Sequence, residues 1–458
     1  MNRNISIRST YMALFILLLG ILVSLQLGYS AFYGLLIGTI VVYIVALRHG
    51  YLHKDILFMM YTGIKSAWIV LLMMAIIGSL IGVWMKGGTI PTMMYLGFRY
   101  LSRVNFILAS FLITTIISMV LGTSLGSIST IGMALLGIGR GLNVPIPLLA
   151  GAIISGAYVG DRSSPMSSSM NLTCVITETK LTDNLKHMMT TMSPVFILCT
   201  LFYFWTGRAY IPDSTTNSQI AALQQILLSY FYISPIHLLS PFIIIVLAIF
   251  RIPIITSLGM GFFVSCIFIL FTGHLTLKEI LYSALLGFHP TNFYLSSILS
   301  GGGLLSMKNV ILIIASSTAL NGILDGTGMI APLIQKFIQK IKSIGHLIMQ
   351  TSFLSFIIAA ITCNQTLSII ITGKFLQPTF SNYGVSKNTL ARTLSDTGTV
   401  LVPLIPWNVN AIVIATIFRV SVWHFIPYSV LCYLLPIFTV FYGFMGWVQK
   451  DNNAHSSY

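Results

Sequence analysis

Charged residues are scarce in this sequence. Asp, Glu, Lys and Arg make up only 7% of the 458 residues, whereas 56% are hydrophobic. With a mean hydropathy of +0.92, the chain has too little polar surface to cover a water-soluble globule. Apolar runs long enough to cross a bilayer, about 20 residues each, recur along its length. The composition therefore predicts an all-α polytopic membrane protein.

Signatures of enzymes, metal sites and ATP-driven pumps are also missing. The sequence contains no G-x-x-x-x-G-K-[ST] phosphate loop, no nucleophile elbow and no H-E-x-x-H motif. Its five cysteines have neither metal-ligand nor redox spacing, and its nine histidines are scattered. We therefore expect no enzymatic activity, no cofactor and no ATP hydrolysis by this chain.

The predicted membrane segments are spread over the whole chain, and three of them are long with polar centres. The longest polar stretch, residues 208–225, is predicted to be a linker, and no soluble domain is expected. The segments lie near residues 10–29, 32–47, 66–85, 105–138, 146–175, 191–206, 234–250, 253–272, 280–300, 309–333, 346–373, 388–418 and 421–447.

Basic residues outnumber acidic residues by 24 to 9, which gives a net charge of +15. In a soluble chain this balance would suggest a nucleic acid partner, but in a membrane protein basic residues mark cytoplasmic loops and contact anionic lipids. Arg3 and Arg8 precede the first segment, and Arg48 and Lys54 follow the second. We predict a multi-pass protein of the cell membrane with a cytoplasmic N-terminus and no nucleic acid partner, although the basic loop 86–104 opposes this orientation.

Short motifs recur in the same order in the two halves of the chain. GVWMKGGTI (82–90) matches GILDGTGMI (322–330), TSLGSISTI from Thr123 matches TCNQTLSII from Thr362, and GDRSSPMSSSMN (160–171) matches SDTGTVLVPLIPWN (395–408). The charges place the start of the first half inside and the start of the second outside, so the copies are predicted to be inverted repeats, as in many secondary transporters. The expected division is 1–206 and 234–447 for the two repeats, 207–233 for an extracytoplasmic linker and 448–458 for a cytoplasmic tail.

Glycine and proline interrupt the apolar runs where hydroxyl and amide side chains gather. Non-helical backbone inside a bilayer is tolerated only where it is buried in protein or lines a wet cavity. Unwound carbonyls with Ser and Thr oxygens make a hard-oxygen shell suited to Na⁺, so interrupted or re-entrant helices around an ion site are predicted. The interrupting residues are Gly122, Gly126, Gly160, Pro165, Gly398, Pro403 and Pro406.

Three of the nine acidic residues, Asp161, Asp325 and Asp396, fall in these apolar, interrupted regions. An ionised carboxylate at membrane depth costs at least about 2.5 kcal/mol, so it rarely occurs without a partner or a task. For each of the three, a purely structural role remains an alternative to ion binding. Asp161 could pair with Arg162 or cap a helix, Asp396 could cap a helix from Thr399, and Asp325 could serve at a helix end. The neighbouring Ser and Thr residues could also simply pack helices together.

The stretches SGAYVGDRSSPMSSSMNL, GTSLGSISTIG and LARTLSDTGTVLVPLIPWN resemble the NhaC family of sodium/proton antiporters. GGTIP (87–91) and NGILDGTG (321–328) also fall at the places that this family leads us to expect. The resemblance runs from about residue 60 to about residue 420. It implies an inner-membrane antiporter that expels Na⁺ using inward proton flow. Some relatives exchange organic substrates such as malate and lactate.

The resemblance and the polar interruptions together give a set of candidate site residues, with Na⁺ bound at Asp161 and Asp396. Position by position, Asp161 matches the family's G-D-K acid, and Arg162 stands in place of its Lys. The predicted ion- and proton-binding residues are Asp161, Asp396, Thr123, Ser124, Ser127, Ser164, Ser167, Asn171, Thr362, Asn364, Thr397, Thr399 and Asn408. Accessory roles are expected for Arg162, Ser168, Asp325, Ser395 and Trp407.

Three positions depart from the family pattern. The family usually has an acid where this chain has Ser168, often Glu where it has Ser395, and often Asp where it has Asn364. Fewer fixed negative charges in the pathway should hold fewer cations or protons. These departures bear on both the stoichiometry and the identity of the ion.

Two transport mechanisms follow from the sequence. In the first, Asp161 and Asp396 alternately bind Na⁺ and H⁺, so that the two transported ions are exchanged. In the second, Arg162 and the serine-rich segments bind a small organic carboxylate or amino acid, whose movement is coupled to an ion. A passive channel or a non-transporting membrane protein is a third, less favoured class, and the sequence leaves a homo-oligomer open.

Overall fold

The computed structural model describes residues 5–101, 104–210, 214–272, 275–330, 332 and 341–449. Within these ranges the chain is helical and has no strand, and Phe288 and Gly301 form an isolated bridge. The predicted all-α class is therefore confirmed. Of the predicted tail 448–458, only the first two residues belong to the described part of the chain.

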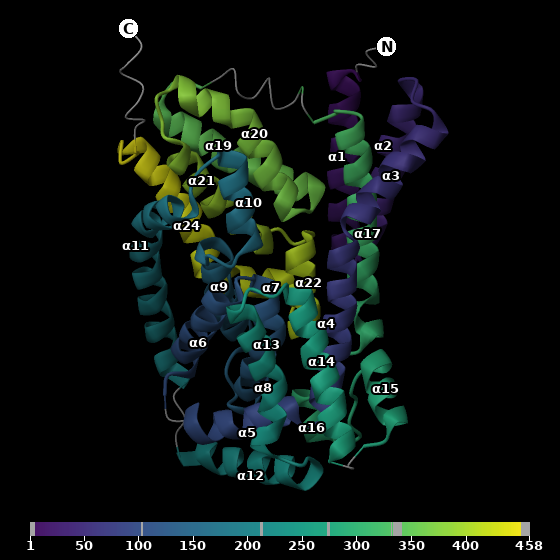
Figure 1. Ribbon diagram of the computed structural model, residues 1–458, viewed down its shortest axis with the longest axis vertical. Coiled ribbons are helices and arrows are strands. Elements are labelled where there is room, and N and C mark those ends of the chain that lie inside the picture. The colour runs from purple at the N-terminus through teal and green to yellow at the C-terminus, as the bar shows by residue number, and fades with distance from the viewer. Residues whose placement is uncertain are drawn as a thin grey trace.

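The first half of the chain contains long helices and several short ones that follow a break (Figure 1). They are α1 (Ile7–Gln26), α2 (Ala31–Arg48), α3 (His53–Ser66), α4 (Trp68–Lys86), α5 (Thr89–Leu101), α6 (Phe106–Leu121), α7 (Ser124–Ser127), the π-helix η1 (Ile128–Gly132), α8 (Met133–Gly141), α9 (Ile146–Ser163), α10 (Ser168–Thr177), α11 (Leu181–Gly207) and the 3₁₀-helix η2 (Arg208–Tyr210).

The second half contains a similar mixture of long and broken helices. They are α12 (Ser214–Tyr230), η3 (Pro235–Leu238), α13 (Leu239–Ile249), α14 (Ile254–Phe271), α15 (Leu277–Leu286), α16 (Phe293–Ile298), η4 (Leu304–Met307), α17 (Lys308–Gly326), α19 (Ile344–Thr362), α20 (Gln365–Asn382), α21 (Lys387–Leu394), the π-helix η5 (Ser395–Thr399), η6 (Val402–Leu404), α22 (Val409–Phe418), α23 (Val422–Phe425), η7 (Ile426–Tyr428) and α24 (Val430–Phe444).

Seven described helices are long and apolar enough to cross a membrane, and three bent helix pairs could each form a further span. The molecule is thus a multi-pass membrane protein. Its predicted segments 105–138, 146–175 and 388–418 are each interrupted near the middle, as expected from their polar centres. The predicted segment 346–373 is also interrupted, between α19 and α20. The run 280–300 is not one span, because α15 ends at Leu286 and the next helix has only six residues. The predicted linker includes α12, which sequence polarity concealed.

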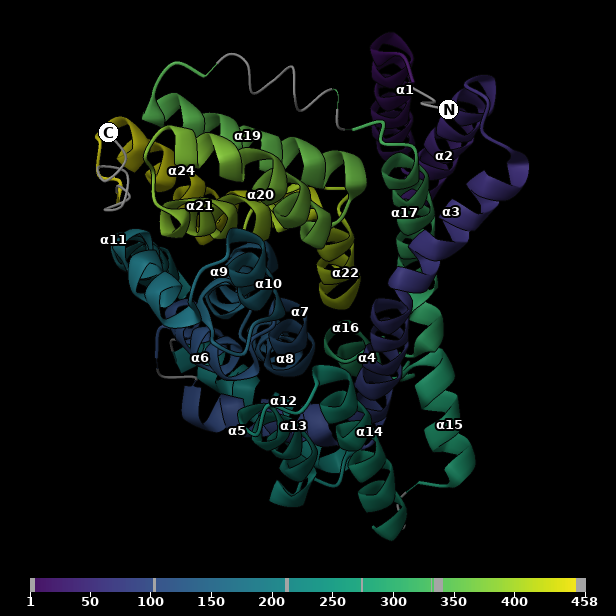
Figure 2. The same ribbon diagram turned by 45° about the horizontal axis from the view of Figure 1, so that its top comes forward.

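The elements separate into groups, which can be followed in Figure 2, where the top of the molecule is turned toward the viewer. Helices α1, α2, α3 and α17 pack along one side, with α17 against both α2 and α3. Helices α19, α20, α21 and α24 form a second group, in which α19 contacts α20 and α24. The start of α1 and the end of α24 lie toward the same end of the molecule, opposite α5 and α12 (Figure 1).

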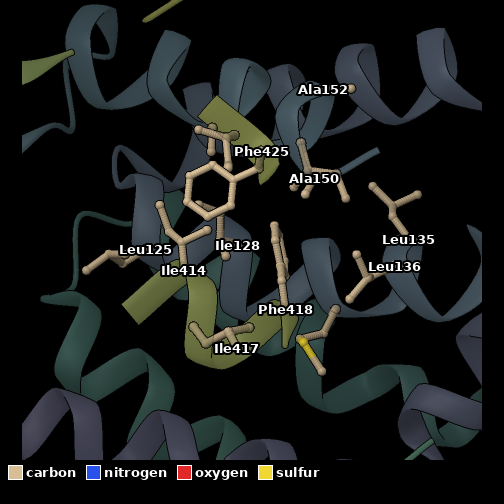
Figure 3. Packing of buried hydrophobic residues seen from close by; sticks show 14 of the residues in the cluster. Leu125, Ile128, Leu135, Leu136, Ala150, Ala152, Ile414, Ile417, Phe418 and Phe425 are labelled. Atoms are coloured by element: carbon tan, nitrogen blue, oxygen red, sulfur yellow. The ribbon is translucent and has the colours of Figure 1, made fainter. Parts of the chain in front are cut away.

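The two halves of the chain share one apolar core at α22. Ile414, Ile417 and Phe418 of this helix lie beside residues of α7, η1 and α9 (Figure 3). A Cβ at Gly132 of η1 would lie 3.4 Å from the Phe418 ring, so the helices meet closely there. Lipid tails are as apolar as these side chains, and close van der Waals contact therefore stabilises the core more than exclusion of water does. The residues of the first half shown in this core are Leu125, Ile128, Leu135, Leu136, Ala150 and Ala152.

Candidate functional site

Asp161 lies near the C-terminal end of α9, and its carboxylate-bearing side chain is only 6% exposed. Ser124 Oγ donates a hydrogen bond to Asp161 Oδ2 at 2.8 Å, and Gln365 Nε2 donates to the same oxygen at 3.4 Å. Ser169 Oγ lies 2.9 Å from Oδ1, and Ser167 Oγ lies 3.4 Å from it. Donors from α7, α20 and the start of α10 thus converge on one buried carboxylate.

The break after α6 packs against the break after α9, and this contact brings Ser124 to Asp161. Gly122 ends α6 in the left-handed region, with φ 66°. A Cβ at Gly122 would lie 2.5 Å from the carbonyl carbon of Met166, so only glycine fits. Ser164 Oγ donates to the Met119 carbonyl at 2.6 Å and ties the second break to α6. Glycine at position 122 therefore permits the close approach on which the site depends.

A second break, between α19 and α20, positions Gln365. Cys363 has φ 53° and ends α19. The Asn364 side chain then accepts hydrogen bonds from the backbone N–H groups of Thr366 at 2.8 Å and Leu367 at 3.3 Å. Asn364 therefore caps α20 and places Gln365 in its first turn.

Asp161 lies on the wall of a cavity of about 410 Å³ between α4, α9, α10, α17 and α20. Asp161 is the one carboxylate among the described lining residues, and no Lys, Arg or His lines the cavity with it. Its single negative charge suits one monovalent cation or one proton. The polar lining residues are Thr123, Ser124, Asp161, Ser168, Ser169, Ser317, Thr318, Asn364, Gln365, Thr366 and Asn410.

Oxygen atoms dominate the ligands that this cavity offers. No group of three or more His, Cys, Asp and Glu side chains that could hold a metal ion occurs in the part of the chain that the structure describes. Hydroxyl and amide oxygens with one carboxylate form a hard-oxygen set, which suits Na⁺ as a transported ion.

Asp396 occupies a different environment, away from the cavity lining. It is fully buried in η5 and forms an ion pair with Arg162 Nε, whose side chain is also fully buried. Thr191 Oγ1 of α11 donates to Asp396 Oδ2 at 3.0 Å, and Thr439 Oγ1 of α24 donates to the same oxygen. Arg162 donates further to Thr191 Oγ1 and Ser163 Oγ, each at 2.9 Å. This pair joins four elements, α9, η5, α11 and α24.

The geometry decides between the local alternatives raised by the sequence. Arg162 does not pair with Asp161, because consecutive helical residues face different directions and Arg162 instead contacts Asp396. Asp396 does not cap a helix that begins at Thr399, because it lies inside a continuous π-helix from Ser395 to Thr399. Na⁺ binding at Asp396 stays a prediction, and its carboxylate oxygens are already used by Arg162 and the two threonines.

Several predicted site residues make structural hydrogen bonds outside the cavity lining. Ser127 Oγ donates to the Thr123 carbonyl at 2.8 Å, and Thr362 Oγ1 donates to the Ile358 carbonyl at 2.7 Å. Thr397 Oγ1 donates to a backbone carbonyl of its own helix at 2.6 Å. These hydroxyls donate to backbone carbonyls of a preceding helix turn, and none of the three residues lines the Asp161 cavity.

The remaining predicted residues fall into three groups. Asn171 Nδ2 donates to the Ser167 carbonyl at 2.8 Å, Trp407 Nε1 to the Ala360 carbonyl at 2.7 Å and Asn408 Nδ2 to the Ala359 carbonyl at 3.2 Å. The hydroxyls of Ser395 and Thr399 are buried without a hydrogen-bond partner among the described residues. Asp325 is exposed at the end of α17, outside the Asp161 cavity. The first group thus supports the breaks, and Asn408 also caps α22.

Sequence reasoning missed Ser169, Gln365 and Asn410. Gln365 Oε1 accepts a hydrogen bond from Asn410 Nδ2 at 2.7 Å, so the two amides form a chain that ends at Asp161. Ser169 lies in the serine-rich stretch, and Gln365 and Asn410 each follow a helix cap by one or two residues. Polar residues in the first helical turn after each predicted break could therefore have been added to the candidate site residues.

Residues 156–447 match the sequence profile of a family described as the Na⁺/H⁺ antiporter family. A Na⁺/H⁺ antiporter NhaC of Alkalihalophilus pseudofirmus is 32% identical over 390 residues, which cover 84% of each chain. A malate-2H⁺/Na⁺-lactate antiporter of Bacillus subtilis is 27% identical over 450 residues and 96% of each chain. An arginine/ornithine antiporter ArcD of Halobacterium salinarum is 32% identical over 389 residues, 83% of this chain and 80% of the relative.

Proposed function

The chain belongs to the Na⁺/H⁺ antiporter family, and from this premise we propose that it exchanges cytoplasmic Na⁺ for external H⁺ across the cell membrane. The observation that carries the proposal is Asp161, a buried carboxylate on the wall of a cavity rich in oxygen ligands. Four side-chain donors hold its two oxygens in place. The site is therefore organised to hold one positive charge at a time.

Exchange follows from competition for this carboxylate. When Asp161 is ionised, the hydroxyls of Ser124 and Ser169 can rotate so that their lone pairs join the carboxylate around Na⁺. When Asp161 is protonated, the negative charge is gone and Na⁺ loses its main attraction. One ion therefore excludes the other, and a change of access between the two occupied states moves them in opposite directions.

Asp396 is assigned a positioning role in this mechanism. Its ion pair with Arg162 fixes the end of α9 against η5, one residue after Asp161. A charge held by an Arg and two threonines is poorly placed to take up and release ions in each cycle. The exchange is thus assigned to Asp161 alone.

The departures from the family pattern support a site of low charge. Ser168 and Asn364, where the family usually or often has acids, both line the Asp161 cavity, whereas Ser395 lies outside the described lining. A cavity wall with one carboxylate in place of up to three holds less positive charge. We therefore assign one exchangeable proton to this cavity in each cycle.

Inverted repeats with residues 1–206 and 234–447 as the two copies are part of the proposal. Both halves contain a helix that ends at a left-handed residue and a following helix with a side-chain cap, Gly122 with Thr123 and Cys363 with Asn364. Both also contain a π-helix, η1 and η5. By the distribution of basic residues, the end of the molecule where α1 starts is cytoplasmic.

Transport of a small organic carboxylate or amino acid is the second candidate. The cavity of about 410 Å³ is larger than a single Na⁺ needs, and two relatives are named for organic substrates. Arg162, which the sequence suggested as the carboxylate ligand, is buried against Asp396 and does not line the cavity. This observation favours the cation antiporter over the organic exchanger.

The test uses everted vesicles from an antiporter-deficient strain, with a preformed proton gradient followed by fluorescence dequenching. Na⁺ should collapse the gradient for the wild type and for Asp183→Asn, an exposed acid on α11, but not for Asp161→Asn. The expected loss is at least about tenfold, because the variant lacks the charge that holds the ion. Full activity of Asp161→Asn at normal expression would overturn the assignment. Uptake of labelled malate and labelled arginine into proteoliposomes tests the second candidate. Uptake that depends on the protein would support transport of an organic substrate, and its absence would count against it.

A further inference from the structure

A second cavity, of about 540 Å³, lies beside the Asp161 cavity between α3, α17 and α20. The two cavities share five lining residues, so they meet along the same wall. Asp325, at the end of α17, lines the second cavity and is exposed. The shared residues are Ala67, Val70, Thr318, Asn364 and Thr366.

We propose that the two cavities form one access route for hydrated monovalent cations, with Asp325 as the acid that concentrates cations at its mouth. This proposal rests on the proposed function, because it names the route by which cations reach Asp161. Asp325 acts before the binding step and does not itself carry an ion across the membrane. In the proposed orientation the mouth faces the cytoplasm.

The wall of the second cavity offers the oxygen ligands that a partly hydrated cation needs. Asn321 is only 6% exposed, and its Nδ2 donates to the Thr362 carbonyl at 2.8 Å, which orients the amide. Its Oδ1 is buried without a hydrogen-bond partner among the described residues. A buried acceptor without a donor costs free energy, and a passing cation or its water can satisfy it. Thr62, Ser66 and Thr366 add hydroxyls along the same wall.

The outer wall is built by an unusually close approach of α3 and α17. A Cβ at Gly322 would lie 2.1 Å from the Met59 carbonyl oxygen, and a Cβ at Gly63 would lie 2.1 Å from the Thr318 carbonyl oxygen. Small residues at such a contact let two helix backbones pack directly. The end of α17 that bears Asp325 is thereby held against α3 at the mouth.

The charge at the mouth is uncompensated in the described part of the chain. Among the described residues Asp325 forms no ion pair, and no Lys, Arg or His lines the second cavity. A carboxylate at the rim of a cleft raises the local cation concentration, and salt screens this effect over about 10 Å at 0.1 M. Asp325 should therefore affect capture of Na⁺ without affecting later steps.

The first test compares the wild type, Asp325→Asn, Asp325→Glu and the control Asp183→Asn in everted vesicles. At low ionic strength Asp325→Asn should raise the apparent KM for Na⁺ about three- to tenfold at unchanged maximal rate, and Asp325→Glu should restore it. Raising the ionic strength with choline chloride should bring the KM values together. An unchanged KM at low salt, or a lost maximal rate, would overturn the role at the mouth.

The second test measures access without transport. Thr366→Cys, at the junction of the cavities, is placed in a variant whose five native cysteines are replaced. A membrane-impermeant thiol reagent should label it from the cytoplasmic side, while Ser110→Cys, buried in α6 outside both cavities, stays unlabelled. No labelling of Thr366→Cys would contradict the route. If Thr366→Cys is labelled but the wild type shows no Na⁺/H⁺ exchange, the access route stands and the proposed function is contradicted.

Discussion

At the scale of single residues, two adjacent charges in one helix have opposite surroundings. Asp161 faces a polar cavity and accepts only hydrogen bonds from uncharged donors, whereas Arg162 is buried in an ion pair with Asp396. Removing one partner of a buried ion pair costs about 3–5 kcal/mol, because the remaining charge is left without compensation. Replacing both partners with apolar residues of similar size can be close to neutral.

The positioning role of Asp396 can be tested by comparing the loss of one partner of the ion pair with the replacement of both. Arg162→Met and Asp396→Leu should each lower the thermal unfolding temperature in detergent, and the double variant should recover a large part of the loss. Its KM for Na⁺ should remain within about threefold of the wild type, since Asp161 keeps its ligands. A stable, correctly inserted double variant that no longer binds Na⁺ would contradict the view that the pair acts only in positioning and that Na⁺ needs Asp161 alone.

At the scale of elements, the site depends on helix breaks that pack against each other. The break at Gly122 meets the backbone of Met166, and the break at Cys363 presents Gln365 to Asp161. The first contact is between backbone atoms, which cannot rotate away as a flexible side chain can. The position of Ser124 relative to Asp161 is thus fixed by a residue that touches no ion.

Gly122→Ala should therefore impair transport although it lies outside the cavity lining. The left-handed conformation alone costs about 1–2 kcal/mol for a residue with a Cβ, and the 2.5 Å approach to Met166 adds to that. We expect a lower unfolding temperature and a raised KM for Na⁺, measured on purified protein and in vesicles. The matched control is Gly259→Ala on α14, where a Cβ would have no neighbour within 4 Å. Equal behaviour of the two variants would contradict the packing argument.

At the scale of the whole molecule, sequence patterning predicted the class and the breaks but not the long-range contacts. Hydropathy and interrupted runs predicted a helical, multi-pass chain whose helices break near Gly122, Pro165 and Pro406, because these depend on local composition. The contacts of Asp396 with Arg162 and Thr191 join residues about 200 positions apart, and no local pattern encodes such a pairing. Helices α3, α5 and α12 were missed because they are short or polar for their length.

The lining of the Asp161 cavity was predicted only in part, because some of its residues reach the cavity through tertiary packing. Asp161, Thr123, Ser124, Ser168 and Asn364 were proposed from the sequence, and all line the cavity. Thr318 and Ser317 were not, because α17 reaches the cavity only through tertiary packing. The predicted hydroxyls at Ser127 and Thr397 bond to their own helices, a choice that depends on side-chain orientation rather than residue type.

The central claim is that Na⁺ and H⁺ compete for Asp161, and direct ²²Na⁺ binding to the purified protein at several pH values tests it. Competition predicts that apparent Na⁺ affinity falls as pH falls, approaching tenfold per pH unit once the site is mostly protonated, because each bound proton must leave before Na⁺ binds. Asp161→Asn should show no such binding at any pH, and Asp183→Asn should match the wild type. Na⁺ affinity independent of pH, or retained by Asp161→Asn, would contradict the exchange mechanism.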